Sequence, residues 1–397
     1  MKSLSFIKQK SLFYIKHYIK VLGRLIIYPF PRDKHLIVYG GVFDLFIDNC
    51  KYLFIYNNEN FKGYRHVWLT KNRKLQSYVQ SLGFKAVYSK SIKGVYLTLR
   101  AKNIIFDDAV FFYTWQFLIS GANRIELWHG IPLKMYCRAY MENQPPYTVK
   151  NWFQDQILDD HMHGTYAVST SKRLDTINSA TFGVPINRLI HASLPRTRIL
   201  LMTESERWQF INKYESPAMV DYYDNLKSET RKKIIYMPTF RDANPNYINE
   251  AIPDWNDLNE YCKTHDILLF LKVHRAAMSF HNTFSNIEIL DNMMDIYPLL
   301  PLYDLLITDY SSIMYDYALM DKPVLLYTYD IEDYMKHSRP LYNDFHQLRK
   351  EMTEVSDYES LKTAIVMNDS DIKRLPVHLY YDCPEDIESI NVFIRGC

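Results

Sequence analysis

The sequence predicts an α/β protein made of two doubly wound halves with a cleft between them. Short apolar runs alternate with helical stretches along the chain, which is the pattern of parallel βαβ units. The runs form two series, separated by a polar, helical segment at about 200–230 that has no strand pattern. The chain has 397 residues, more than one hydrophobic core usually holds, so two domains are expected.

Each half is predicted to contain a set of buried strands. In the first half these are residues 36–40, 65–69, 86–88, 103–107, 124–128 and 166–169. In the second half they are residues 232–237, 267–273, 287–290, 305–308 and 324–327. Ser171 is placed to cap a helix that begins at Lys172, and the closing segment 351–397 is expected to be mostly helical.

The N-terminal segment is basic and amphipathic. Its first 34 residues carry eight Lys or Arg and one Asp, or +7, so the whole-chain charge of +2 leaves −5 for the other 363 residues. Apolar side chains recur at helical spacing at Leu12, Ile15, Ile19, Leu22 and Ile26. Charges interrupt every apolar run before the ~18 residues that span a bilayer, and a signal-peptide pattern is absent. We expect peripheral contact with an anionic membrane surface; the alternative is a helix packed on the protein's own body.

The bulk composition excludes several classes of protein. A net charge of only +2 argues against a nucleic-acid binder. The five cysteines are scattered and indicate a reducing compartment without disulfides or structural zinc: Cys50, Cys137, Cys262, Cys383 and Cys397. His161 and His163 are read as surface residues, and Asp107-Asp108 as an exposed pair at a strand end. No metal and no cofactor is expected.

A polar elbow follows the apolar run 305–308. It contains Asp309, Ser311 and Ser312, and Asp316 lies one turn into the helical pattern that follows. Hydroxyls and free backbone N–H groups at a helix N-terminus are suited to hold a phosphate. The alternative is a serine cap with no further role.

A histidine follows the run 124–128 in the first half. Gly130 and Pro132 force a turn directly after His129, which should place its imidazole at the carboxyl end of a strand. Histidine titrates near neutral pH and is the commonest general base. The pattern alone does not separate a base from a packed core histidine.

Cations and hydroxyls follow two strands of the second half. Pro238-Thr239-Phe240-Arg241 follows the first, and Lys272-Val273-His274 ends the second. Each alone is more typical of a surface residue, but together at adjacent strand ends they predict an anion site that works without a metal. Leu194-Pro195-Arg196 adds a cation near the domain junction.

These motifs resemble one family. His-Gly-Ile-Pro-Leu-Lys, Leu-Pro-Arg-Thr-Arg, Pro-Thr-Phe-Arg, Lys-Val-His and Thr-Asp-Tyr-Ser-Ser-(x)3-Asp occur in the order and spacing of the CDP-glycerol glycerophosphotransferase family of teichoic-acid and capsule synthesis. The resemblance covers about residues 30–365 and implies a GT-B fold of two Rossmann-like domains. With the basic N-terminal segment, the expected parts are a membrane-associating helix at 1–30, an acceptor domain at 31–200, a CDP-alditol donor domain at 201–370 and a tail at 371–397 that packs back on the body.

The resemblance also implies roles for individual residues. His129 would take the proton of the acceptor hydroxyl, and His274 with Lys272 would contact the donor phosphates. Ser311 and Ser312 would hold the pyrophosphate, Asp316 would reach the same site, and Pro238, Thr239 and Arg196 would line the cytidine-diphosphate pocket. The other substrate contacts expected are Trp128, Gly130, Ile131, Pro132, Arg241, Val273 and Asp309.

The expected reaction is transfer of glycerol phosphate from CDP-glycerol to a hydroxyl of a lipid-linked saccharide or polyol-phosphate acceptor, releasing CMP, at the cytoplasmic face of the membrane. The chain departs from the family at Ile131, where Thr is common, and at Arg198, where an acidic residue is common. The second change leaves the preferred alditol open, so CDP-ribitol is a rival donor. The sequence is also compatible with a nucleotide-sugar glycosyltransferase of the GT-B fold and with a non-catalytic membrane scaffold. Retention of His129, His274 and both serines argues against the scaffold.

Overall fold

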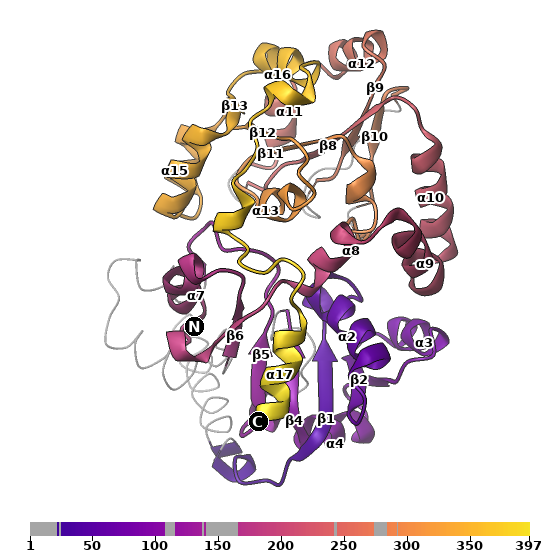
Figure 1. Ribbon diagram of the computed structural model, residues 1–397, viewed down its shortest axis with the longest axis vertical. Coiled ribbons are helices and arrows are strands. Elements are labelled where there is room, and N and C mark those ends of the chain that lie inside the picture. The colour runs from indigo at the N-terminus through magenta and orange to yellow at the C-terminus, as the bar shows by residue number, and fades with distance from the viewer. Residues whose placement is uncertain are drawn as a thin grey trace, which may run out of the picture. The chain divides into compact units, whose positions relative to one another are not determined.

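The computed structural model describes residues 22–23, 25–107, 116–136, 139, 166–241, 244–273, 284–291 and 293–397. The chain divides into two compact units, each built around a parallel sheet (Figure 1). The first unit comprises Met1–His129, Cys137–Arg196 and Asp386–Cys397, and the second comprises Gly130–Tyr136 and Thr197–Glu385. The predicted domain limits stay a prediction.

The sheet of the first unit has seven parallel strands in the order β3-β2-β1-β4-β5-β6-β7. Its strands are β1 (Asp33–Gly40), β2 (Arg65–Thr70), β3 (Ala86–Tyr88), β4 (Ala101–Phe106), β5 (Asn123–Glu126), β6 (Tyr166–Ser169) and β7 (Leu189–His191). All six predicted strands are present, and β7 is an addition. The predicted strand 124–128 is too long, because β5 ends at Glu126 and Trp128 adopts a left-handed conformation with φ of 59°.

Five α-helices of the first unit lie wholly in the described part of the chain, and two of them begin at a capping side chain. They are α2 (Asp48–Asn60), α3 (Arg73–Ser81), α4 (Ile92–Arg100), α7 (Asp175–Phe182) and α17 (Glu388–Gly396). Asn72 and Ser91 accept backbone hydrogen bonds at the starts of α3 and α4. Ser171 caps the 3-10 turn Lys172–Leu174 that leads into α7, as predicted.

The sheet of the second unit has six parallel strands in the order β10-β9-β8-β11-β12-β13. They are β8 (Lys232–Met237), β9 (Ile267–Leu271), β10 (Ile287–Ile289), β11 (Leu305–Thr308), β12 (Val324–Tyr327) and β13 (Thr353–Val355). The first five correspond to the five predicted strands. β13 is an addition, and with it the segment 351–397 is less helical than predicted.

Helices surround this second sheet. They are α8 (Arg198–Leu201), α9 (Glu204–Tyr214), α10 (Pro217–Ser228), α11 (Tyr247–Ala251), α12 (Trp255–Thr264), α13 (Ile313–Ala318), α14 (Ile331–His337), α15 (Asn343–Glu351) and α16 (Tyr358–Ile365). Thr203 and Glu206 form a reciprocal capping box at the start of α9. One core cluster joins strand residues such as Leu269, Ile307 and Leu325 to α12 and α16. The sheet is therefore covered, and its strand ends are the natural place for polar groups.

The expected N-terminal amphipathic helix lies mostly outside the described residues, as do Leu12, Ile15, Ile19, His161 and His163. Leu22 and Ile26 are described, and they are 58% and 72% exposed. A helix long and apolar enough to cross a membrane is not found in the described part of the chain. Membrane contact stays a prediction.

Candidate active site

Two predicted motifs lie at the same edge of the second sheet. Residues 238–241 follow β8 and residues 309–312 follow β11, and these two strands are paired in parallel register from Leu305↔Ile234 to Thr308↔Met237. Carboxyl ends of parallel strands meet at one edge, where ligands of open α/β sheets bind. The structure therefore brings Pro238, Thr239 and Arg241 beside Asp309, Ser311 and Ser312.

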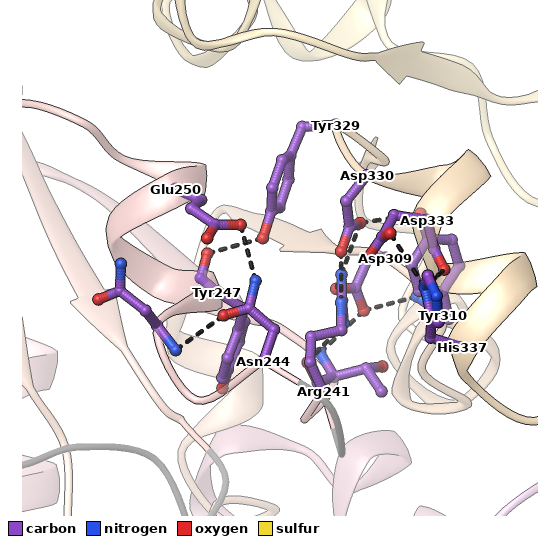
Figure 2. Close-up of polar contacts among 12 residues, drawn as sticks. Arg241, Asn244, Tyr247, Glu250, Asp309, Tyr310, Tyr329, Asp330, Asp333 and His337 are labelled. Carbon is purple, nitrogen blue, oxygen red and sulfur yellow. Dashed lines mark hydrogen bonds and ion pairs between the residues drawn. The ribbon is translucent and has the colours of Figure 1, made fainter.

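A buried ion-pair network connects these loops (Figure 2). The Arg241 guanidinium donates to Asp309 through Nη2 at 2.9 Å and to Asp330 through Nε at 2.6 Å. Its Nη1 donates to the Thr239 carbonyl at 2.5 Å. Asp309 in turn accepts the backbone N–H groups of Thr239 at 2.9 Å and Tyr310 at 2.5 Å. Arg241 and Asp309 therefore fix the backbone of both loops.

Aromatic rings enclose this network. The guanidinium carbon of Arg241 lies 4.8 Å from the ring centre of Tyr334, 4.9 Å from Tyr310 and 5.5 Å from Tyr247. Burial by itself would lower the pKa of Arg241, but Asp309 and then Asp330 raise it above its ordinary value. The charge is thus held in place and neutralised within the protein, which suits a structural role better than direct contact with a substrate.

Asp330 is a site residue that the sequence motifs do not reveal. It follows β12, a third neighbouring strand, and its carboxylate also accepts from the Tyr310 hydroxyl at 3.2 Å. The signal available in the sequence is a polar residue shortly after a buried strand: Asp330 lies three positions after β12, whereas Asp309 directly follows β11. Three adjacent strands therefore each place one charged residue in the network.

The hydroxyls of this edge remain available for a ligand. Ser312 precedes α13, but its side chain does not cap that helix. In the part of the chain that the structure describes, the Ser311 and Ser312 side chains make no hydrogen bond, and neither does the buried Thr239 Oγ1. Each is a donor or acceptor that a phosphate could satisfy.

Asp316 is fully buried within α13. Its carboxylate accepts the Tyr297 hydroxyl at 2.5 Å and also the hydroxyl of Tyr381. These contacts tie α13 to the loop after β10 and to the C-terminal segment. Asp316 thus has clear protein partners, and its predicted contact with the donor stays a prediction.

Lys272 follows β9 and is half-buried. Its Nζ donates to the carbonyls of Asp291 and Met294, both at 3.0 Å. Burial lowers the pKa of Lys272 to about 8, against the opposing effect of Asp295 and Asp291. The buried Val273 follows it, whereas His274 lies outside the described residues.

The predicted base lies in the first unit, on a sharp turn after β5. The Trp128 N–H donates to the buried Glu126 carboxylate at 3.0 Å, and the Trp128 and His129 rings are stacked with centres 4.0 Å apart. His129 is half-buried. Gly130 follows with φ of 139°, a conformation that side chains disfavour, which explains a glycine there.

The residues after Gly130 pack in the second unit. Ile131 and Pro132 are buried there. The Met135 N–H donates to Pro340 at 2.8 Å, and the Tyr342 N–H donates to Leu133 at 3.0 Å. The two halves of the histidine motif thus belong to different packing units.

Arg196 lies in the first unit, whereas Pro238 and Thr239 lie in the second. Its Nη1 pairs with Asp48 at 2.8 Å, and the side chain is 4% exposed. Its backbone N–H donates to the Asn49 side chain at 3.1 Å. The predicted lining of the cytidine-diphosphate pocket by Arg196 stays a prediction, but the guanidinium already has a protein partner.

The expectation that Asp107 is exposed is wrong. Asp107 is fully buried and accepts the Cys50 N–H through both oxygens, at 3.0 and 3.1 Å. Burial, and next the charge of Asp48, raise the pKa of Asp107 well above its usual value. Asp108 lies outside the described residues, and within the described ones no group of three His, Cys, Asp or Glu side chains is arranged to hold a metal.

The comparison with protein families identifies the class. The chain belongs to the CDP-glycerol:poly(glycerophosphate) glycerophosphotransferase family, whose model matches residues 25–362. This confirms the resemblance that the motifs indicated and places the chain among the polyol-phosphate transferases of teichoic acid synthesis.

Individual relatives are distant but consistent. The chain is 26% identical to the teichoic acid poly(glycerol phosphate) polymerase of Bacillus spizizenii over 363 residues, 87% of this chain and 86% of that protein. It is 24% identical to the polymerase of the same name from Staphylococcus epidermidis, covering 75% of this chain but 40% of that protein. It is 26% identical to the ribitol-phosphate polymerase TarK of Staphylococcus aureus, covering 70% of this chain and 53% of that protein.

Solved structures confirm the fold. The wall teichoic acid polymerase TagF aligns with a TM-score of 0.71 at 20% identity, over 98% of this chain and 97% of that chain. The UDP-GlcNAc 2-epimerase of Neisseria meningitidis aligns with a TM-score of 0.51 at 11% identity, over 91% of this chain and 98% of that chain. The architecture is therefore GT-B-like. Proteins with different activities share this architecture, so function has to be argued from the site.

Proposed function

We propose that this chain transfers glycerol phosphate from CDP-glycerol to a hydroxyl of a lipid-linked saccharide or polyol-phosphate acceptor, and that CMP is released. The observation that carries the proposal is the family match over residues 25–362. A variant of TagF that was soaked with CDPG has the same fold at 21% identity and a TM-score of 0.69. The strand-end hydroxyls of the second unit supply the groups that such a donor needs.

The donor would bind at the edge formed by the loops after β8 and β11. Ser311, Ser312 and the Thr239 hydroxyl would donate to the phosphate oxygens, while Arg241 and Asp309 hold the loops that carry them. Lys272 and His274 would add positive charge beside the phosphates. This division gives Arg241 and Asp309 a supporting role rather than direct contact.

The reaction would be a displacement at the phosphorus atom of glycerol phosphate. The acceptor hydroxyl oxygen forms the new P–O bond, the bond to CMP breaks, and His129 takes the proton of the attacking hydroxyl. A positioned general base typically contributes ~10²–10⁴-fold. Charge on the transferring oxygens would be stabilised by the hydroxyls and cations of the donor site.

The acceptor and membrane assignments belong to the same proposal. The basic segment 1–30 would lie on the anionic cytoplasmic face of the membrane and bring the enzyme to its lipid-linked acceptor. A chain lacking residues 1–28 should lose binding to anionic liposomes. An unchanged bound fraction would remove this part of the proposal while leaving the chemistry untouched.

CDP-ribitol is a second candidate donor. The observation that favours it is that ribitol-phosphate polymerases match this chain at 26–27% identity, as well as the glycerol-phosphate enzymes do. Arg198, which stands where the family commonly has an acidic residue, is a reason to test both donors.

The decisive experiment measures nucleotide release with CDP-glycerol, CDP-ribitol and UDP-sugars in turn, with a membrane extract as acceptor. CMP from CDP-glycerol supports the proposal, CMP from CDP-ribitol alone selects the second candidate, and UDP release would replace both with a glycosyltransferase. His129→Ala should lower turnover by about 10²–10⁴-fold. His191→Ala, an exposed histidine of the same unit paired with Asp175, is the matched control and should keep wild-type turnover.

A further inference from the structure

The turn that carries His129 is held by a buried side chain from a distant part of the sequence, Asn49 in α2. The Asn49 Nδ2 donates to the Trp128 carbonyl at 2.8 Å, and this carbonyl belongs to the peptide that joins Trp128 to His129. Asn49 is fully buried. Its amide therefore fixes the orientation of the peptide plane from which the His129 side chain projects.

This turn requires such support because its backbone is strained. Trp128 has φ of 59°, in the left-handed region that is disfavoured for a residue with a Cβ atom. A residue persists there when surrounding contacts over-determine the conformation. Three contacts do so: the Glu126 carboxylate on the Trp128 N–H, the Asn49 amide on its carbonyl, and Phe182 edge-on against its ring at 5.4 Å.

Asn49 is itself fixed on its other side. Its Oδ1 accepts the backbone N–H of Arg196 at 3.1 Å, and the Arg196 Nη1 pairs with Asp48, the residue before Asn49, at 2.8 Å. Both functional groups of the Asn49 amide are thus used, which excludes a flipped orientation. Arg196 sits in the Leu-Pro-Arg motif, so this motif reaches the His129 turn through a side chain that the motifs do not include.

We propose that Asn49 is a positioning residue for the general base, and that Asp48 and Arg196 hold Asn49 in the required orientation. This inference rests on the proposed function, in which His129 takes the proton of the acceptor hydroxyl. It assigns Arg196 to the acceptor-activating side of the enzyme. Displacement of a catalytic group by about 1 Å can lower the rate ~10²-fold, so loss of the Asn49 hydrogen bonds should lower kcat by a measurable factor.

The prediction separates turnover from donor binding. Asn49→Leu keeps the branching at Cγ but loses both hydrogen bonds, so kcat should fall about 10- to 100-fold. The KM for CDP-glycerol should change less than about twofold, since the donor loops lie in the other unit. In a His129→Ala background the same change should have no further effect on kcat, because residues that act as one unit are non-additive.

A matched control is available on the same helix. Asn57 is also fully buried in α2, and its amide bonds to the Tyr39 hydroxyl at 2.9 Å and to Asn391 at 2.9 Å, away from the His129 turn. Asn57→Leu should lower stability to a similar extent while kcat stays within about twofold of wild type. Equal losses of kcat in both variants, or an undiminished Asn49→Leu effect in the His129→Ala background, would overturn the proposal.

A second readout does not depend on turnover. The rate at which diethylpyrocarbonate modifies His129, read by mass spectrometry, should rise in Asn49→Leu and stay unchanged in Asn57→Leu. If neither CDP-alditol is turned over, the proposed function fails, and the modification rate still tests whether Asn49 positions His129. Should Asn49→Leu not fold, Asn49→Asp keeps the acceptor for Arg196 and removes the donor to Trp128, and the same two readouts apply.

Discussion

Replacement of Arg241 by methionine should destabilise the second unit without destabilising the first. Arg241→Met removes four hydrogen bonds, one to Asp309, two to Asp330 and one to the Thr239 carbonyl, and leaves the Asp309 carboxylate buried without its counter-ion. The side chains of Arg241 and Asp309 are 4% and 0% exposed, so water cannot take the place of the lost guanidinium. Breaking a buried pair by removal of one partner costs about 3–5 kcal/mol.

Hydrogen exchange measured by mass spectrometry can locate this cost. A loss of about 3–5 kcal/mol corresponds to two to four powers of ten in the opening equilibrium. Peptides that cover β8 and β11 should therefore exchange faster by roughly that factor, while peptides of β1 and β4 in the first unit should be unaffected. CDP-glycerol binding should weaken in parallel, because the network holds the loops proposed to bind it.

Two further variants make the test sharp. Asp309→Asn combined with Arg241→Met removes the unpaired charge and should recover at least about 1 kcal/mol of the loss. Arg231→Met breaks a more exposed pair of the same unit, with Glu229 at 2.6 Å and side chains 29% and 21% exposed, and should cost no more than about 1 kcal/mol. The reasoning is refuted if Arg241→Met lowers stability no more than Arg231→Met does, or if hydrogen exchange accelerates equally in the peptides of both units.

Three more outcomes follow from single contacts. Burial lowers the pKa of Lys272 to about 8, so the folded state holds the charged lysine at a free-energy cost below pH 8, and this cost falls as the pH rises toward 10.5. The unfolding free energy of the wild type relative to Lys272→Met should therefore rise by about 2–3 kcal/mol between pH 8 and 10.5 in urea titrations. A difference that does not change with pH would contradict the lowered pKa of Lys272. Tyr381→Phe removes a hydroxyl donated to the buried Asp316 carboxylate and should cost about 1.5–3 kcal/mol in urea unfolding, whereas the same change at the more exposed Tyr358 should cost less. Asp254→Ala removes the cap that accepts two backbone N–H groups of α12 and should lower stability by about 1 kcal/mol, with Asp254→Asn as the control that keeps it.

The strands and the fold class are determined largely by local sequence. Buried parallel strands appear as continuous apolar runs, and Ile267–Leu271 and Val324–Tyr327 are clear cases. β7 and β13 escape prediction because neither is a continuous apolar run: the outer residues of β7, such as His191, are exposed or half-buried, and all three side chains of β13, such as Thr353, are half-buried. Such short edge segments become strands through pairing with a neighbour, which the local sequence does not contain.

The sequence by itself also determined which motifs are candidates for the site, because the order and chemistry of the polar residues after each strand are visible in it. Only the tertiary structure decided which partners those residues contact. Arg241 and Asp309 lie 68 positions apart, and their pairing holds the backbone of the two loops that follow β8 and β11. Asn49 and Arg196 lie 147 positions apart, and no motif includes Asn49. Local patterns determine which side chains end up at a strand end, but burial and hydrogen bonding depend on residues that the chain brings together from a distance.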